Sequence, residues 1–227
     1  MSGTRRVGFR LYLITDRKAV KSVSLLDACE AALQVAADLA PPGSVALQLR
    51  EKDLDAREVY VLACRLREIT TRVGAPLFIN ERVDIAIASG ADGVHLPGAS
   101  IGAGAARKLL GDDRFVGVSA HSAPDLVAAS REGQADFAVF GPVYQPLSKG
   151  SYGAEQGSAA LFQACEVGSV PVFALGGITP ARAAELYAKP ESVNLAGVAA
   201  IGSIIGADSP RQAMRAMLEA LKVAPSL

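Results

Sequence analysis

The chain has 227 residues, of which half are apolar and a fifth are charged, so it has enough apolar side chains for a folded core. Lysine and arginine together number 23, as do aspartate and glutamate, and the formal net charge is therefore zero. A chain without a basic excess lacks the field that holds nucleic acid or an anionic membrane, so we expect neither as a partner. No apolar run approaches the length of a membrane span.

The three cysteines, Cys29, Cys64 and Cys165, lie far apart and form no CxxC pair. This argues against a zinc site and suits a reducing compartment. We expect all three on apolar helix faces in the core. Residues 1–9 contain no apolar stretch of signal length, so we expect a flexible N-terminal extension and a cytoplasmic protein.

Short apolar runs alternate with longer helical patterns along the whole chain. Most of the runs are continuous, which is typical of strands buried on both faces. The predicted strands are 10–15, 44–50, 76–80, 93–96, 115–119, 136–141, 171–175 and 192–200.

Helix start signals occupy the intervals between these strands. Polar residues that accept hydrogen bonds from the first helical turn, and prolines within that turn, mark where each helix begins. The expected N-caps are Ser24, Asp55 with Glu58 as a capping box, Ser158, Thr179 before Pro180, and Ser209 before Pro210.

A weak repeat occurs at 90–94 (GADGV) and at 133–137 (GQADF). Each copy lies where a predicted helix ends and a predicted strand begins. We interpret the repeat as ordinary helix-stop chemistry, in which glycine ends the helix.

Eight strand–helix units in one chain predict a (β/α)₈ TIM barrel that forms a single domain over 1–227. The competing architecture is a doubly wound open sheet, which usually carries a glycine-rich turn after its first strand. Here the first strand is followed by residues 15–18 (TDRK), without such glycines. The barrel is therefore the favoured fold.

Two cations follow the second predicted strand. Arg50 and Lys52 are two positions apart, so on an extended segment their side chains face the same way. At the carboxyl end of a barrel strand, such a pair suits a pyrophosphate or another dianion. The alternative is a pair of solvated charges. Lys149, in a loop rich in Ser and Gly, is a candidate third cation or an ordinary surface lysine.

The ends of the seventh and eighth strands suggest a phosphate site. Gly176 and Gly177 allow a ligand to approach the backbone, and Gly202 and Ser203 offer N–H groups. Barrels often bind phosphate between these two loops. The alternative is that the paired glycines only turn the chain.

His121 follows a strand end and is the better candidate for general acid/base work, because imidazole titrates near neutral pH. Its alternative role is a hydrogen bond at a helix entry. His95 lies within an apolar stretch, and we expect it to pack or to bond to the backbone. Glu81 is a candidate Mg²⁺ ligand, or else an ion-pair partner of Arg82.

These strand-end segments, in this order, resemble the thiamine-phosphate synthase/TenI family. A single motif is weak, but six in order at strand ends are specific, and together with their flanks they cover nearly the whole chain. The family fold is a (β/α)₈ barrel. The matching segments are 48–52 (QLREK), 79–84 (INERVD), 90–96 (GADGVHL), 117–122 (GVSAHS), 141–144 (GPVY) and 174–179 (ALGGIT).

The resemblance implies one of two activities. The synthase joins a pyrimidine pyrophosphate to a thiazole phosphate and releases pyrophosphate with the help of Mg²⁺. The TenI branch aromatises a thiazole phosphate carboxylate tautomer by proton transfer, without a metal.

The resemblance also implies roles for particular residues. For the synthase, Arg50, Lys52 and Lys149 would bind pyrophosphate. For TenI, His121 would transfer the proton. The remaining expected substrate contacts are Gln48, Asn80, Ser119, Ser148, Gly176, Gly177, Ile201, Gly202 and Ser203.

The chain departs from the synthase pattern where the metal would bind. Glu81 replaces an Asp, and Ser100 replaces a second Asp ligand. In the loop after the sixth strand, one Thr is lost and another becomes Ser148. Because these losses weaken an Mg²⁺–pyrophosphate site, they favour the TenI-like tautomerase.

Three hypotheses follow: a TenI-like tautomerase without cofactor, a divergent synthase using Mg²⁺, and a non-catalytic binder of phosphate ligands. The expected partners are a phosphorylated thiazole and, for the synthase, a pyrimidine pyrophosphate. The sequence leaves a homo-oligomer open. It also leaves open whether residues 145–156, with glycines in and around them, form a lid or a disordered surface loop.

Overall fold

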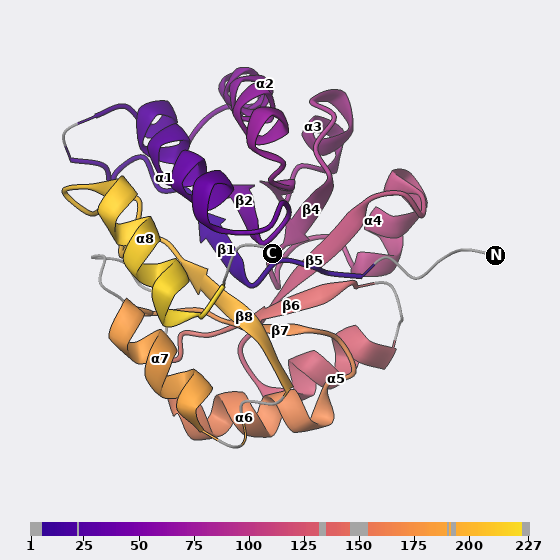
Figure 1. Ribbon diagram of the computed structural model, residues 1–227. Helices are drawn as coiled ribbons and strands as arrows, with labels where there is room; N and C mark the ends of the chain where they lie inside the picture. Colours follow the sequence, from indigo (N-terminus) through magenta and orange to yellow (C-terminus); the bar gives the residue numbers. More distant parts are fainter. Residues whose placement is uncertain are drawn as a thin grey trace.

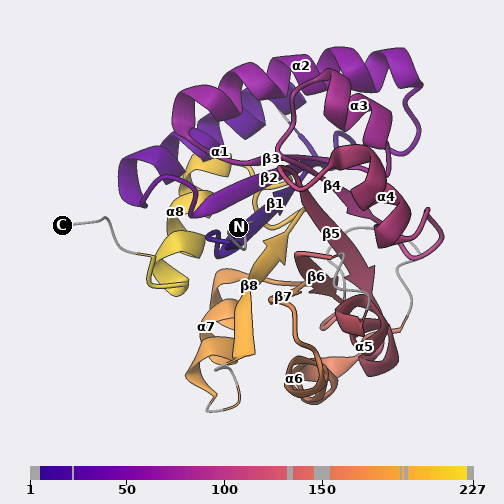
Figure 2. The same ribbon diagram turned by 90° about the vertical axis from the view of Figure 1, so that its right-hand side faces the viewer.

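The computed structural model describes residues 6–21, 23–131, 135–145, 154–189, 191 and 194–223. Within them, parallel strands close into a barrel in sequence order, and helices surround it (Figures 1 and 2). The strands are β1 (Leu11–Ile14), β2 (Val45–Leu49), β3 (Leu77–Asn80), β4 (Gly93–Leu96), β5 (Phe115–Ala120), β6 (Phe137–Phe140), β7 (Val172–Ala174) and β8 (Leu195–Ala200). The predicted (β/α)₈ barrel is confirmed.

A helix follows each strand. The helices are α1 (Leu25–Leu39), α2 (Ala56–Val73), α3 (Val83–Ala88), α4 (Ala103–Leu110), α5 (Ala123–Arg131), α6 (Gly157–Val167), α7 (Pro180–Ala188) and α8 (Pro210–Ala220). Every predicted strand has a counterpart. The eighth begins later than predicted, at Leu195, and residues 192–193 lie outside the described part of the chain.

The helix starts follow the predicted caps with one exception. Asp55 and Glu58 exchange side-chain and backbone hydrogen bonds in a full capping box. The prediction for Ser158 is wrong, because α6 begins one residue earlier and places Ser158 inside its first turn. The Ser158 hydroxyl instead accepts a hydrogen bond from the Lys189 ammonium group at 2.9 Å. Ser24, Thr179 and Ser209 cap their helices as predicted.

Aromatic rings close the barrel from its amino-terminal side. Tyr12, Phe78, Phe137 and Phe173 are fully buried, and their ring centroids lie 5.3 to 6.3 Å apart. Phe9 stacks on this group and is 3% exposed. The expectation that residues 1–9 form a flexible extension is therefore wrong for Phe9, because its ring fills the base of the barrel.

Glycine at two inward positions makes room for the rings. A Cβ atom on Gly117 would overlap the ring of Phe137, and one on Gly197 would overlap the ring of Phe173. Since interiors pack without spare volume, the rings and the glycines depend on each other. The result is a dry floor across the barrel.

The repeated Gly–Asp motif has a role that the sequence analysis missed. Asp92 accepts hydrogen bonds from the Leu77 backbone N–H at 2.7 Å and from Arg67 at 2.6 Å. Asp136 likewise accepts from the Val116 N–H and from Arg107, both at 2.6 Å. Each aspartate thus ties its own strand to the preceding strand and to an outer helix. Helix-stop chemistry alone does not account for the motif.

The cysteines largely follow expectation. Cys29 and Cys165 are buried, whereas Cys64 is only half-buried, so the prediction of a core position is wrong for Cys64. None of the helices that the structure describes has the length and apolar character needed to cross a bilayer.

We predict that Asp136→Ala lowers the free energy of unfolding by about 2–4 kcal/mol, because it leaves Arg107 and a backbone N–H without their carboxylate. The matched change Asp92→Ala should cost less, about 1–2 kcal/mol, since the Asp92 side chain is 40% exposed against 16% for Asp136. Urea unfolding of both variants measures the difference. Equal losses would contradict this ranking by exposure, and no loss in either variant would contradict the role assigned to the motif.

Candidate active site

A cavity of about 330 Å³ opens at the carboxyl ends of the strands. Its volume suits a small organic ligand. The cavity brings together every described residue that we predicted as a substrate or catalytic residue. They are Gln48, Arg50, Lys52, Asn80, Ser119, His121, Gly176, Gly177, Ile201, Gly202 and Ser203.

Two of the expected site residues lie outside the described part of the chain. Ser148 and Lys149 belong to residues 146–153, which also contain most of the expected lid. The described ends of that loop are held together, because the backbone N–H of Gly157 donates to the carbonyl of Val143 at 3.0 Å.

The end of β2 contributes the expected cations. Gln48 and Arg50 are two positions apart at the end of β2, and Lys52 begins the turn that follows; all three line the cavity. The Gln48 amide donates to the Asn80 side-chain oxygen at 3.4 Å, which links the ends of β2 and β3. One wall of the cavity is therefore positively charged and rich in hydrogen-bond donors.

His95 belongs to the cavity, and the sequence analysis missed this. Its side chain is 3% exposed, and its Nε2 shares a hydrogen bond of 3.0 Å with the Ser119 hydroxyl. Of the two roles expected for His95, packing is confirmed, because its ring lies 5.7 Å from that of Tyr12 and 6.0 Å from that of Phe137. Burial, with a smaller contribution from the nearby charge of Arg50, lowers the pKa of His95 to about 3. The imidazole is therefore neutral near pH 7 and positions Ser119.

His121 is exposed at the cavity rim, after β5. Its Nδ1 lies 2.6 Å from the Gly141 carbonyl oxygen, which can only accept, so Nδ1 carries the proton. In the neutral ring the lone pair is then on Nε2, which can accept a proton from a ligand. The helix-entry bond that we gave as its alternative role is made by the His121 backbone N–H, which donates to Asp125 at 2.8 Å.

The β7–α7 turn has a backbone conformation that favours glycine and lines the cavity. Gly176 and Gly177 have φ angles of 101° and 61°, a region that favours glycine. A Cβ on Gly176 would also collide with the Pro142 backbone. Behind the turn, Arg182 donates to the Gly177 carbonyl at 2.7 Å and stacks on the Tyr144 ring at 4.6 Å. The turn is thus fixed in place from outside the cavity.

The β8 end completes this side of the cavity. Gly202 and Ser203 follow Ile201 in a tight turn, in which the Ile201 carbonyl accepts from the Ile204 and Ile205 N–H groups. Within the described part of the chain, no carbonyl accepts from the N–H groups of Gly202 and Ser203. N–H groups of this kind can bind a phosphate.

The expected metal ligand lies elsewhere. Glu81 is exposed and does not line the cavity, and neither does Ser100. The alternative role expected of Glu81 was an ion pair with Arg82. That pair is not formed, and the Arg82 guanidinium instead donates to Asp84 at 2.9 Å. Glu81 has a φ of 64°, which is unusual for a residue with a long side chain.

Mg²⁺ prefers carboxylate oxygen ligands, and the donor set does not fit it. The cavity lining contains no Asp or Glu. Among the described residues, no group of three or more His, Cys, Asp or Glu side chains could hold a metal ion. The lining, as far as the structure describes it, offers cations and N–H groups that can bind an anion.

The other lining residues that the sequence analysis missed are mostly apolar or backbone-forming. They lie next to predicted site residues on the same strands, so their position relative to the strand ends was the available signal. They are Ile14, Pro97, Val139, Gly141, Pro142, Leu175, Ile178, Ala199 and Ala200.

Known proteins resemble this chain over most of its length. A family described as "Thiamine monophosphate synthase" matches residues 11–204. A Geobacter sulfurreducens protein named "Putative thiamine-phosphate synthase" is 46% identical, with 95% of this chain and 96% of that protein covered. A "Thiamine-phosphate synthase" of Caldanaerobacter subterraneus subsp. tengcongensis is 35% identical, with 90% of both chains covered.

Solved structures give the same result. The "Thiamine phosphate pyrophosphorylase" of Pyrococcus furiosus superposes with a TM-score of 0.79 at 28% identity, covering 96% of this chain and 97% of the other. A 3-hexulose-6-phosphate synthase superposes with a TM-score of 0.61 at 19% identity, which shows the shared fold alone.

We predict that His95 makes stability depend on acidity. The unfolded chain takes up a proton at this residue near pH 6.5, whereas the folded protein keeps the ring neutral down to about pH 3. Because the unfolded state then binds more protons, stability falls as the pH drops below 6.5, by up to about 1.4 kcal/mol per pH unit.

Urea unfolding at about pH 7 and about pH 5 measures this effect. His95→Gln should remove up to about 2 kcal/mol of the loss between the two conditions. If both proteins lost the same stability, His95 would not be the neutral buried group described here.

Proposed function

The chain belongs to the thiamine monophosphate synthase family and is an enzyme of thiamine biosynthesis, and we propose that it is the metal-independent tautomerase of a thiazole phosphate carboxylate. The observation that carries the proposal is a cavity lined by cations and a histidine, without any carboxylate. Such a lining suits a substrate with two anionic groups, and it does not require a divalent ion to bind it.

In this proposal the two anionic groups of the substrate bind at opposite sides of the cavity. The phosphate binds the backbone N–H groups of the Gly176–Gly177 and Gly202–Ser203 turns. The carboxylate binds Arg50 and Lys52 at the end of β2, with Asn80 and Ser119 as neutral hydrogen-bond partners. The thiazole ring then lies over the apolar floor, within reach of the rim.

His121 acts as the general base and acid. With Nδ1–H donated to the Gly141 carbonyl, Nε2 takes a proton from a ring carbon of the substrate. The same nitrogen returns a proton elsewhere in the substrate, so the net reaction is an isomerisation. The Gly141 carbonyl also stabilises the imidazolium that forms in between, because it accepts from the Nδ1–H throughout.

The second candidate is a thiamine-phosphate synthase, which the names of the relatives favour. Gln48, Arg50, Lys52, Asn80 and Ser119 all line the cavity, where they would also suit a pyrophosphate leaving group. However, the described lining of the cavity contains no Asp or Glu for the Mg²⁺ that this reaction uses. We therefore rank it second.

We predict that the purified protein converts the thiazole tautomer to its aromatic form in the presence of EDTA. His121→Asn should lower kcat by about 10²–10⁴-fold, because it removes the proton-transferring nitrogen. Binding of the aromatic product should change by less than about threefold, since its phosphate and carboxylate bind groups other than the His121 imidazole. Proton NMR follows the conversion, and calorimetry measures the binding.

A paired assay tests the second candidate. The protein is mixed with the pyrimidine pyrophosphate and the thiazole phosphate, with and without Mg²⁺, and pyrophosphate release is recorded. We expect no release above the uncatalysed rate. Mg²⁺-dependent release with formation of thiamine phosphate would establish the synthase instead. Binding without turnover in either assay would support the non-catalytic binder.

A further inference from the structure

Glu51 stands between the two cavity cations, yet it points away from them. The Arg50 and Lys52 side chains line the cavity, whereas the Glu51 side chain is buried and only 2% exposed. It continues the outward row of β2, after the buried Leu47 and Leu49. The other positions named in this row are leucines, and a carboxylate there is costly to bury. Its hydrogen-bond partners must therefore offset the loss of hydration.

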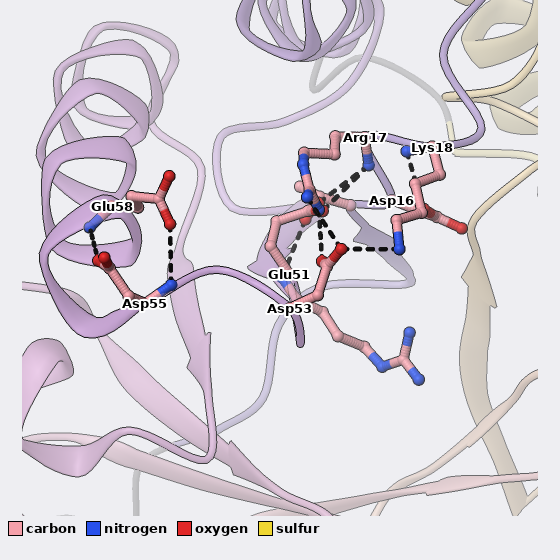
Figure 3. Close-up of polar contacts among 9 residues, drawn as sticks. Asp16, Arg17, Lys18, Glu51, Asp53, Asp55 and Glu58 are labelled. Atoms are coloured by element: carbon pink, nitrogen blue, oxygen red, sulfur yellow. Dashed lines mark hydrogen bonds and ion pairs between the residues drawn. The ribbon is translucent and has the colours of Figure 1, made fainter.

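Those partners come from Arg17 in the β1–α1 loop. The Arg17 backbone N–H donates to both Glu51 carboxylate oxygens, at 3.1 and 3.2 Å, and its Nη1 donates at 3.2 Å. The same guanidinium donates from Nη2 to Asp53 at 2.9 Å. Figure 3 shows Arg17 between the two carboxylates, with Lys18 close to Asp53.

Two further contacts fix the ends of this segment. The Arg50 backbone N–H donates to the Thr15 hydroxyl at 2.9 Å, which joins it to the end of β1. On the other side, the capping box of Asp55 and Glu58 begins α2 (Figure 3). Between these points, Glu51 is held by Arg17 through its backbone N–H and its guanidinium.

We propose that Arg17 and Glu51 are positioning residues, which turn Arg50 and Lys52 into the cavity and so set its affinity for a phosphate or carboxylate anion. This inference rests on the anion-binding role given to Arg50 and Lys52 in the proposed function. If Glu51 lost Arg17, its charge would turn toward water. Because Arg50 precedes Glu51 directly after β2, and Lys52 begins the turn that follows it, this movement of Glu51 would displace both side chains from the cavity.

The test measures binding of inorganic pyrophosphate by calorimetry, in EDTA. Arg17→Ala should weaken binding about tenfold or more, because two charge-assisted contacts lose their geometry. The matched control is Lys18→Ala. This variant removes one positive charge next to Arg17. The Lys18 side chain contacts Asp53, as that of Arg17 does, but it does not contact Glu51. Lys18→Ala should weaken binding less than about twofold.

A second measurement separates positioning from a direct charge effect. In an Arg50→Ala/Lys52→Ala background, adding Arg17→Ala should weaken residual binding no further, because Arg17 acts through those two side chains. Should Arg17→Ala fail to fold because of the unpaired Glu51, Arg17→Ala/Glu51→Gln removes both charges and replaces it. Because the neutral Gln side chain has no charge to turn toward water, this double variant should bind within about threefold of the unaltered protein, whereas a direct effect of the Arg17 charge would leave a loss of about tenfold.

Several results would overturn the proposal. They are equal weakening by Arg17→Ala and Lys18→Ala, unchanged binding in Arg17→Ala, or a full Arg17 effect in the background without Arg50 and Lys52. No pyrophosphate binding by the unaltered protein would overturn it together with the anion-binding role. A different result would contradict the proposed function alone. In that result, Arg17→Ala weakens pyrophosphate binding as expected, but the unaltered protein shows no tautomerase turnover.

Discussion

The candidate site depends on the two-residue alternation of side chains inside a closed barrel. On β3, Phe78 points inward and forms part of the aromatic floor, and two residues later Asn80 points inward and lines the cavity. On β6, Phe137 and Val139 have the same relation. A dry floor therefore lies directly beneath the polar layer. Electrostatic interactions in that layer are stronger than in water, because one side of it is closed to solvent.

Charge selection follows from which side chains this alternation directs inward. The carboxylate nearest the cavity cations, Glu51, faces outward and is neutralised by Arg17, while Arg50 and Lys52 face inward. The cavity lining thus keeps its positive charges and contains no acid. This separation leaves a described lining that favours an anionic ligand. It also explains how a chain without net charge can form a local anion site.

Much of the fold was predictable, because buried parallel strands are continuous apolar runs and helix caps are local chemistry. The site was predictable where residues follow strand ends, as for Arg50 and His121. His95 was missed because its neighbours Val94 and Leu96 are apolar; a linear segment does not show that the neighbours face the helices while His95 faces inward. Asp92 was misread for a similar reason, since its hydrogen-bond partners are distant in sequence and adjacent only in the closed barrel.

The central claim is that the cavity binds a thiazole with two anionic groups, a phosphate and a carboxylate, without a divalent metal. Calorimetric titration with the thiazole phosphate carboxylate, in EDTA and again in MgCl₂, tests it most directly. We predict dissociation constants that agree within about twofold, because Arg50, Lys52 and the backbone N–H groups supply the positive charge. Binding that appears only in MgCl₂, or strengthens about tenfold or more with it, would contradict the account.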